Sequence, residues 1–447
     1  MAKKMLFLFV LLLSLTGMLK AQVTTAGMSG KVMADEESVI GATVVAVHEP
    51  SGTSYGTVTN VDGRFSLQGM RSGGPYKVTV SYIGYQTAIY TDIQLQLGET
   101  YSLNVTLHEA SELLGEITIT ASKSKFSAEK TGATTNISSE QLTTLPSINR
   151  SISDFTRISP YASGNSFGGR DGRSNTFTVD GANLNNNFGL SSGLPGGGNP
   201  ISLDAIDEVQ VVIAPYDVRQ ANFIGAGINA ITKSGTNAYR GSAYMYFNNE
   251  VMRGNKIGDT DFGARAEESK TVYGATFGGP IIKDKLFFFA NVEYEKSPQQ
   301  VITWRAAKEG EDPNNSTISR TTEADLAEFS QILKDKYGYN TGSFTDFPAD
   351  VTNLKLLGRI DWNINQGNKL SVRYNFTNNK TWEAPNGSSG NTGYRLAYNR
   401  VSAYSMSYAN SCYSLQNIVN SATAELNSRF SSNISNQLLF TYLSLIH

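Results

Sequence analysis

The fold is decided by the stretch Leu286-Phe287-Phe288-Phe289-Ala290-Asn291-Val292-Glu293-Tyr294-Glu295, in which side-chain character alternates. Successive side chains of a β-strand point to opposite sides of its sheet. One side of this strand therefore carries Leu286, Phe288, Ala290, Val292 and Tyr294. The other side carries Phe287, Phe289, Asn291, Glu293 and Glu295. We therefore predict a long strand with one apolar face and one more polar face.

The same alternation returns along the second half of the chain. It is clear over 354–364 and 370–377, and it is weaker in four other stretches. Those four are 239–248, 272–278, 422–428 and 438–442. Strands of about ten residues with period-two alternation and aromatic ends are typical of outer-membrane β-barrels. Residues 237–447 are therefore predicted to form about seven antiparallel transmembrane barrel strands.

The connections between these strands alternate in length. Short turns at 282–285 and 365–368 contrast with long polar loops at 250–268, 297–351 and 379–401. Outer-membrane barrels place short turns on the periplasmic side and long loops outside. The alternative is a soluble β-sandwich, which would have shorter strands and loops not sorted by length. Because bacterial barrels have even strand numbers, about seven strands predict an incomplete barrel, from an N-terminal fragment or a truncated reading frame.

The N-terminus has the pattern of an export signal. Lys3 and Lys4 precede the apolar run 5–15, and Ala21 stands before Gln22. A positive start, a short apolar run and a small residue before the cut are typical of a cleaved signal peptide. The alternative is a transmembrane anchor, for which the apolar run is too short. We therefore predict a signal peptide over 1–21 and a mature protein that is exported.

Composition excludes several classes of protein. The 447 residues hold 37 Lys+Arg and 39 Asp+Glu, so there is no excess of positive charge to attract nucleic acid. One Cys and three His are too few for a disulfide framework or a Cys/His metal cluster. We predict no cofactor and no metal site. The 17% charged residues fall below the roughly 25% of ordinary soluble domains.

Residues 22–108 show short alternating segments separated by turn signals. Strands are predicted at 29–32, 40–47, 56–60, 64–67, 76–82 and 101–107. Asp62-Gly63 before an alternating run is a hairpin signal. Strands at this spacing predict a small β-sandwich. A calcium loop at Asn60-Val61-Asp62-Gly63 is the alternative, but the glutamate ligand at the required distance is missing.

Residues 109–127 form a predicted linker with one β-prone island, Leu114–Ala121. Such a segment offers unpaired backbone groups that can add as an edge strand to a partner's sheet. The alternative is a last strand of the preceding sandwich.

Residues 128–236 are polar and rich in Gly and Asn. Short helices over 138–145 and 148–158 and strands over 175–180, 209–213 and 226–232 predict a small α/β domain with long loops.

One motif has the form of an enzyme site. Gly164-Asn165-Ser166-Phe167-Gly168 fits the G-x-S-x-G pattern of hydrolases. That chemistry requires a strand before the serine, a helix after it and a downstream histidine. The residues before Ser166 make a poor strand, and His447 is the only later histidine. We therefore predict no catalytic residues and no enzyme activity.

Several stretches together point to known families. Gly30-Lys31-Val32, 40–44, Val61-Asp62-Gly63-Arg64-Phe65 and Tyr82-Ile83-Gly84-Tyr85 resemble the carboxypeptidase-regulatory-like domain, a non-catalytic prealbumin-like sandwich. Four further stretches lie downstream, namely 169–181, Ile206-Asp207-Glu208-Val209-Gln210-Val211, 225–233 and 277–289. In this order they resemble the plug and first barrel hairpin of a TonB-dependent outer-membrane receptor of the Bacteroidetes, Oar-like type.

The resemblance implies a function and its residues. A receptor of this family sits in the outer membrane, binds an extracellular ligand and takes it up with energy from TonB of the inner membrane. The implied plug covers 128–236. The implied TonB-coupling residues are Glu116, Ile117, Thr118, Ile119, Thr120 and Ala121. The candidate ligand-binding residues are Arg170, Arg173, Asn183, Asn185 and Asn186, for which hydrogen bonding between plug and barrel is the alternative.

The expected partners are TonB, outer-membrane lipid and a ligand of open class, with a surface lipoprotein as a further candidate and no nucleic acid. Peptide, glycan, siderophore and protein ligands all stay open, because specificity lies in the loops. A surface adhesion or structural protein built from the same parts, or an inactive truncated remnant, is the alternative function.

Overall fold

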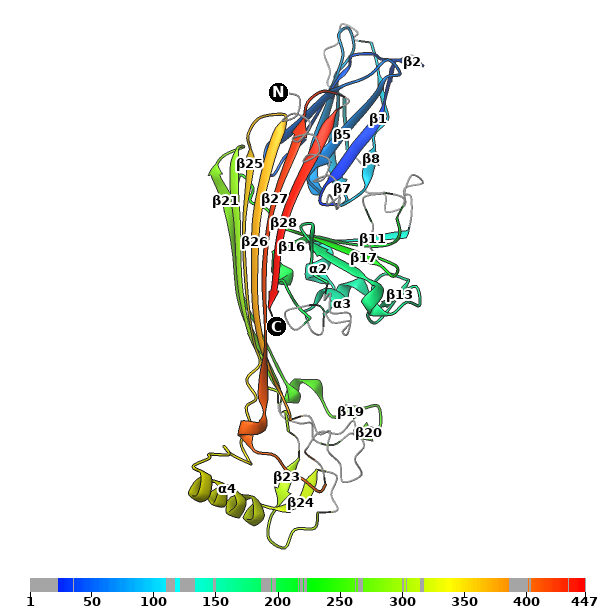
Figure 1. Ribbon diagram of the computed structural model, residues 1–447. Helices are drawn as coiled ribbons and strands as arrows, with labels where there is room; N and C mark the ends of the chain where they lie inside the picture. The colour runs from blue at the N-terminus through cyan, green and yellow to red at the C-terminus, as the bar shows by residue number, and fades with distance from the viewer. Residues whose placement is uncertain are drawn as a thin grey trace, which may run out of the picture.

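The computed structural model describes most of residues 23–446 (Figure 1). Left out within this range are 35, 110–116, 121–132, 148–149, 186–193, 195–197, 216, 218–219, 221–222, 262, 264–267, 300, 303, 314–316, 386–400, 402 and 433. The predicted signal peptide lies outside the described residues. The predicted fold class, mainly β with about seven long antiparallel strands at the end, is confirmed.

The N-terminal domain is a sandwich of two five-stranded sheets. The first sheet is centred on β1 (Ala26–Ala34) and also contains β2 (Glu37–Ser38), β5 (Arg64–Met70), β8 (Thr100–Ser102) and β9 (Val105–Leu107). The second runs in the order β10 (Ile117–Thr120), β7 (Ala88–Leu95), β6 (Gly73–Ser81), β3 (Thr43–His48) and β4 (Thr53–Val58). The inward-facing side chains of both sheets, including Met28, Val44 and Tyr76, form one apolar core.

Two sequence predictions for this sandwich are wrong in detail. The strand predicted at 56–60 lies at Thr53–Val58, because Thr53, Tyr55 and Thr57 are the side chains that turn inward. Strand β7 was not predicted. Its pairing with β6 shifts register twice, and Asp92 has a positive φ of 60°, so its side chains do not alternate regularly. A tight turn does form at Asn60–Gly63, where the Asn60 side chain accepts from the Asp62 and Arg64 amides. The predicted hairpin is wrong, because the turn joins β4 to β5 and these two strands lie in different sheets.

The middle domain has a five-stranded sheet with short helices. Its strand order is β11 (Ala133–Ser138), β16 (Ile206–Ala214), β17 (Gly227–Thr232), β14 (Thr176–Val179) and β15 (Ala182–Asn183). Helices α2 (Ser139–Thr144) and α3 (Ile152–Thr156) lie where helices were predicted, and both are shorter than expected. Ser138 and Gln141 form a capping box that fixes the start of α2.

The G-x-S-x-G stretch belongs to a small hairpin of this domain. Ser166 lies in β13 (Ser166–Phe167), which pairs with β12 (Ala162–Ser163). The Ser166 hydroxyl donates to the carbonyl of Arg170. The serine therefore stands in a hairpin rather than at a strand-to-helix turn, and the site lacks the geometry of a nucleophile elbow.

The third unit is one antiparallel sheet of seven strands, each paired with its neighbours in chain order. The strands are β18 (Arg240–Asn249), β21 (Ser269–Ile282), β22 (Leu286–Lys296), β25 (Thr352–Asn363), β26 (Asn368–Glu383), β27 (Tyr413–Arg429) and β28 (Ser435–Ile446). Strand β21 is longer than its predicted segment because glycines interrupt its alternation. A Cβ at Gly274 would come within 2.3 Å of the Tyr244 ring, so glycine lets that ring lie across the strand.

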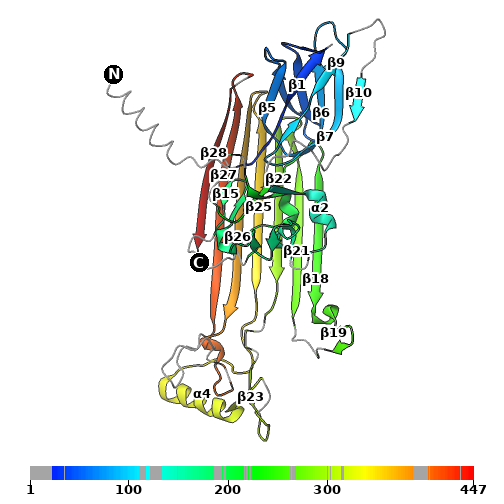
Figure 2. The same cartoon turned by 90° about the vertical axis from the view of Figure 1, so that its right-hand side faces the viewer.

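The two faces of this sheet differ as predicted. In β22, Val292 and Tyr294 are exposed, whereas Phe287, Asn291 and Glu293 are buried. Exposed apolar side chains continue across the same face at Leu356, Ile360, Trp362, Val372 and Tyr374. Figures 1 and 2 show the sheet curved, with the middle domain against its inner face. The outer face is thus an apolar surface suited to lipid.

The two ends of the sheet are also different. The sandwich lies at the end of the short turns (Figure 1), where the Asn237 amide donates to Pro50 and the Asn363 side chain donates to Thr53. The long loops lie at the opposite end. They carry η3 (Glu250–Arg253), β19 (Lys256–Ile257), β20 (Thr260–Asp261), β23 (Arg305–Ala307), β24 (Ile318–Thr322), α4 (Glu323–Tyr337) and η4 (Ala409–Ser411). No helix of the described part of the chain is both long and apolar enough to cross a membrane.

Candidate functional site

The middle domain meets the inner face of the long-strand sheet through buried charges, and one tight turn sets this contact up. Val179 pairs with Ala182, so Asp180 and Gly181 form a two-residue hairpin loop in which both φ angles are positive. Asp and Gly are the residues that such a turn favours. The buried Asp180 carboxylate accepts from the Thr232 amide at 3.0 Å and from its hydroxyl at 2.7 Å.

Two arginines of the sheet face this carboxylate. Arg373 Nε lies 3.5 Å from Asp180 Oδ1, and Arg359 Nη1 lies 4.0 Å from the same atom. Arg359 also donates to the carbonyl of Thr232. Because all these side chains are buried, the attraction is little screened by solvent. The turn of the middle domain is therefore fastened to β25 and β26 by charge.

The same arginines have acid partners within the sheet. Arg359 forms a two-point contact with Asp361, at 2.8 and 2.9 Å, and Arg373 donates to Glu425 at 2.9 Å. Ser371 donates to Asp361 at 2.6 Å. We call Asp180, Arg359, Asp361, Arg373 and Glu425 the Asp180 cluster. Its buried charges alternate in sign, so each is compensated by a neighbour, which burial of charge requires.

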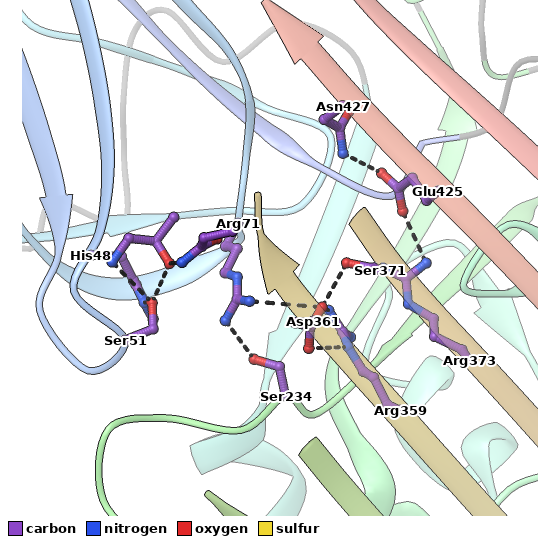
Figure 3. A network of polar contacts seen from close by, with 12 residues as sticks. His48, Ser51, Arg71, Ser234, Arg359, Asp361, Ser371, Arg373, Glu425 and Asn427 are labelled. Atoms are coloured by element: carbon purple, nitrogen blue, oxygen red, sulfur yellow. Dashed lines mark hydrogen bonds and ion pairs between the residues drawn. The ribbon is translucent and has the colours of Figure 1, made fainter. Parts of the chain in front are cut away.

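The sandwich also reaches into the Asp180 cluster (Figure 3). Arg71, between β5 and β6, points at the sheet, with Nη2 3.7 Å from Asp361 and Nη1 donating to Ser234 at 3.0 Å. Its guanidinium lies 5.7 Å from the centre of the Phe287 ring. Thr24 donates to Glu425 at 2.9 Å. A cavity of about 1210 Å³ lies where the three units meet, lined by polar residues of each.

A second buried cluster holds the other end of the middle domain. Glu293 of β22 accepts from Lys355 at 2.9 Å, Tyr244 at 2.9 Å and Ser202 at 2.8 Å. Arg150 of the middle domain lies 3.8 Å from Glu293 and pairs with Asp204. We call Glu293, Lys355, Tyr244, Ser202 and Arg150 the Glu293 cluster. It joins three sheet strands, β18, β22 and β25, to two separate segments of the middle domain.

Apolar and neutral contacts complete this interface. The Pro200 carbonyl accepts from Asn375 at 3.1 Å and from Thr377 at 2.7 Å. Phe289, Leu357 and Val419 of the sheet are part of the apolar core of the middle domain. The middle domain is thus held across the inner face by two charge clusters and one apolar patch.

The sandwich also contacts the middle domain directly, through hydrogen bonds between Leu97 and Glu208. The Leu97 amide donates to both carboxylate oxygens of Glu208, at 3.0 and 3.1 Å. The Leu97 carbonyl accepts from the side chains of Asn136 and Gln210. Burial raises the pKa of Glu208 to about 8, although these N–H donors favour the charged form. We call this contact the Leu97 clamp.

The candidate ligand-binding residues are not brought together by the described structure. Arg170 and Arg173 are exposed, and Arg173 pairs with Asp171 at 2.9 Å, which lowers the pKa of that carboxyl. Asn185 accepts from the Phe177 amide at 2.7 Å and donates to the Asn175 carbonyl at 3.0 Å. Asn183 accepts from the Asn185 amide at 2.9 Å. Asn183 and Asn185 thus stabilise their own domain, and Asn186 lies outside the described residues.

The candidate coupling segment is visible in its central part. Ile117–Thr120 form β10, which pairs in parallel with β7 of the sandwich. Glu116 and Ala121 lie outside the described residues. The segment is therefore an edge strand of the sandwich, as in the alternative interpretation, and its role in coupling stays a prediction.

Sequence reasoning missed the residues that form the two charge clusters. Lys355, Arg359 and Asp361 stand on the predicted polar face of one strand, where the alternation placed them without a role. A buried charge on the inner face of a membrane strand requires a partner. A charged residue at an inward-facing position of a predicted barrel strand is therefore the signal by which these three residues could have been found. Among the described residues, no group of three or more His, Cys, Asp or Glu side chains could hold a metal ion.

Comparison with known families agrees with this architecture. Residues 27–108 match the carboxypeptidase regulatory-like domain, and residues 231–446 match the outer membrane beta barrel domain. The second half of the chain thus matches an outer-membrane β-barrel domain, which indicates that the protein lies in the outer membrane. It is a homologue of the TonB-dependent transporter Oar of Myxococcus xanthus, with 25% identity over 343 residues. The match covers 72% of this chain and 30% of that protein, so the chain spans less than a third of the length of this curated relative.

Solved structures with similar folds include two receptors of Pseudomonas aeruginosa. The siderophore receptor PirA gives a TM-score of 0.41 at 14% identity, covering 71% of this chain and 43% of that chain. A mutant of the ferric enterobactin receptor PfeA gives a TM-score of 0.46 at 13% identity, covering 71% and 42%.

Proposed function

We propose that this chain serves TonB-dependent uptake of an extracellular ligand across the outer membrane, with the middle domain as the plug. The observation that carries the proposal is the way the middle domain lies against the inner face of the sheet, joined to it by the Asp180 and Glu293 clusters. A domain in this position stands in the path of a solute through the barrel.

The chemistry of this contact supports a plug that can move. Two clusters of ion pairs and hydrogen bonds hold the interface beside one apolar patch, and their polar groups regain favourable contacts with water when they separate. An apolar interface of the same size would expose hydrocarbon on opening, at about 25 cal/mol per Å². The polar interface is therefore stable when closed and can be hydrated when it opens.

The energy must come from outside the outer membrane, which holds no ATP. The β-prone residues 116–121 stand directly before the middle domain in sequence. A short extended segment binds a partner's sheet by adding as a strand. We propose that TonB binds these residues and that a pull on them rearranges the middle domain, whose first strand is β11 (Ala133–Ser138).

The ligand is proposed to enter from the end of the sheet that carries the long loops. The loop stretches around β19, β23 and α4 lie there, away from the sandwich (Figures 1 and 2). Arg170 and Arg173 of the middle domain are proposed to contact it, because their guanidinium groups are exposed. The ligand class stays open, a surface lipoprotein is a candidate partner, and no catalytic step is proposed.

Deletion of 114–121 tests the proposal. A transporter loses uptake and loses binding of the periplasmic domain of its own TonB, while surface binding of its ligand survives. An adhesion protein would be unaffected by the deletion. Replacing 114–121 with a Gly/Ser stretch of equal length is the control for linker length and should also abolish TonB binding.

A further inference from the structure

The sandwich already holds the segment that the proposed function assigns to TonB. Strand β10 lies at the edge of the second sandwich sheet beside β7, as Figure 2 shows. Four residue pairs are in parallel register, from Ile117 opposite Ala88 to Thr120 opposite Thr91. The backbone edge of β10 that faces β7 is therefore occupied within the chain.

We propose that the sandwich stores the coupling segment as its edge strand, and that TonB must displace it from β7 in order to bind. The inference rests on the proposed function, since it concerns the same residues. A strand binds a second sheet through N–H and C=O groups that are free. While β10 is paired with β7, the edge of β10 that faces β7 is already used. We infer that the sheet of TonB adds to this same edge, so that β7 and TonB compete for it.

The stored strand is held weakly enough to be exchanged. It pairs over four residues only, and parallel pairing is slightly less stable per residue than antiparallel pairing. By contrast, the sheet strands β26 and β27 pair over sixteen positions. A short edge strand can leave β7 while β7 stays paired with β6.

The storage site is fixed relative to the middle domain. Strand β7 ends at Leu95, and two residues later Leu97 is bound in the clamp by Glu208, Asn136 and Gln210. Arg71 fastens the sandwich to the long-strand sheet as well. The edge of β7 therefore lies at the periplasmic mouth of the barrel. When β10 is released, the segment passes from β7 to TonB, and the sandwich stays docked on the sheet and on the middle domain.

A disulfide lock tests the storage. Ile119 lies opposite Tyr90, which is half-buried, so Ile119→Cys with Tyr90→Cys should cross-link on oxidation in a Cys412→Ser background. The control pair is Ile119→Cys with Val58→Cys. Val58 is on β4, four strands away across the same sheet or about 19 Å, and should not cross-link. The Tyr90→Cys single variant shows that the sandwich tolerates the change.

Binding of the purified periplasmic domain of the organism's own TonB is then measured on the 447-residue chain. We expect at least a tenfold loss of affinity in the oxidised lock, full recovery with a reductant, and no change in the control pair. Equal affinity of the locked and reduced forms would overturn the inference, as would a lock pair that fails to cross-link. If the reduced forms and the parent also fail to bind TonB while the lock forms, the proposed function itself is wrong and the inference falls with it.

Discussion

Removal of the Glu293 carboxylate should loosen the middle domain from the sheet strongly. In the variant Glu293→Gln, the ammonium group of Lys355 stays buried, with 1% of its side chain exposed, and loses the carboxylate 2.9 Å away. Leaving one charge of a buried pair without its partner costs about 3–5 kcal/mol. Ser202 and Tyr244, which donate to Glu293 at 2.8 and 2.9 Å, also lose a charged acceptor.

The consequence is measurable by hydrogen exchange in outer-membrane vesicles. We assume that the middle domain detaches from the sheet before its own strands open. A loss of 3–5 kcal/mol in the free energy of detachment then raises the hydrogen-exchange rates of β16 and β17 by roughly 10² to 10³-fold or more. The double variant Glu293→Gln with Lys355→Met removes both charges and should recover most of the protection, because no unpaired charge remains.

Two results would contradict the proposed role of the Glu293–Lys355 pair. The first is exchange in Glu293→Gln within about threefold of the parent, well under 1 kcal/mol. The second is a double variant no better protected than the single one. The surface pair Arg305–Glu311 provides the matched control, since it is exposed to solvent and Glu311→Gln should leave exchange in the middle domain unchanged.

Three further predictions concern the other contacts. Arg71→Ala should weaken the docking of the sandwich on the long-strand sheet by about 1–2 kcal/mol and raise hydrogen exchange in β5 and β6. Arg71→Lys should give an intermediate rise. Hydrogen exchange in β25 should not change, because Arg359 still pairs with Asp361. The pKa of Glu208 is raised from 4.5 to about 8 in the folded protein. Between these two pH values the folded form keeps a proton that the unfolded form has lost, so the contribution of Glu208 to the free energy of unfolding is full below pH 4.5 and is lost as the pH rises to 8. Urea titration should show this decline in the parent, and a decline that persists in Glu208→Gln would contradict it. Ile360→Lys, on the exposed apolar face, should cost about 2–4 kcal/mol in a bilayer and reduce membrane assembly, whereas Thr260→Lys in a loop should assemble like the parent.

The fold could be predicted to the extent that it is local in sequence. The alternation in 286–295 and 354–364 reports directly which side chains face lipid, because a strand's period is two. The Asp180-Gly181 turn is local as well, because Asp-Gly is a dipeptide that favours a turn with positive φ angles. Strand β7 was not readable, since its bulged pairing with β6 breaks the period.

The charge clusters could not be paired from the sequence. Asp180, Arg359 and Glu425 come from three distant stretches, and only the folded chain brings them together. Asn185 is a candidate ligand contact because the resemblance places it in a polar loop of the plug, and that role stays a prediction. In the structure its side chain closes the loop after β14 on the backbone of Phe177 and Asn175, a contact that the sequence did not indicate.

If the middle domain is the plug, it can be drawn away from the barrel while the barrel stays intact. Pulling on residue 117 of the protein in a supported bilayer tests this most directly. We expect residues 133–232 to extend first, by roughly 350 Å at about 3.5 Å per residue, with the barrel strands still folded. Extension of the strands from β18 onward before the middle domain would contradict it.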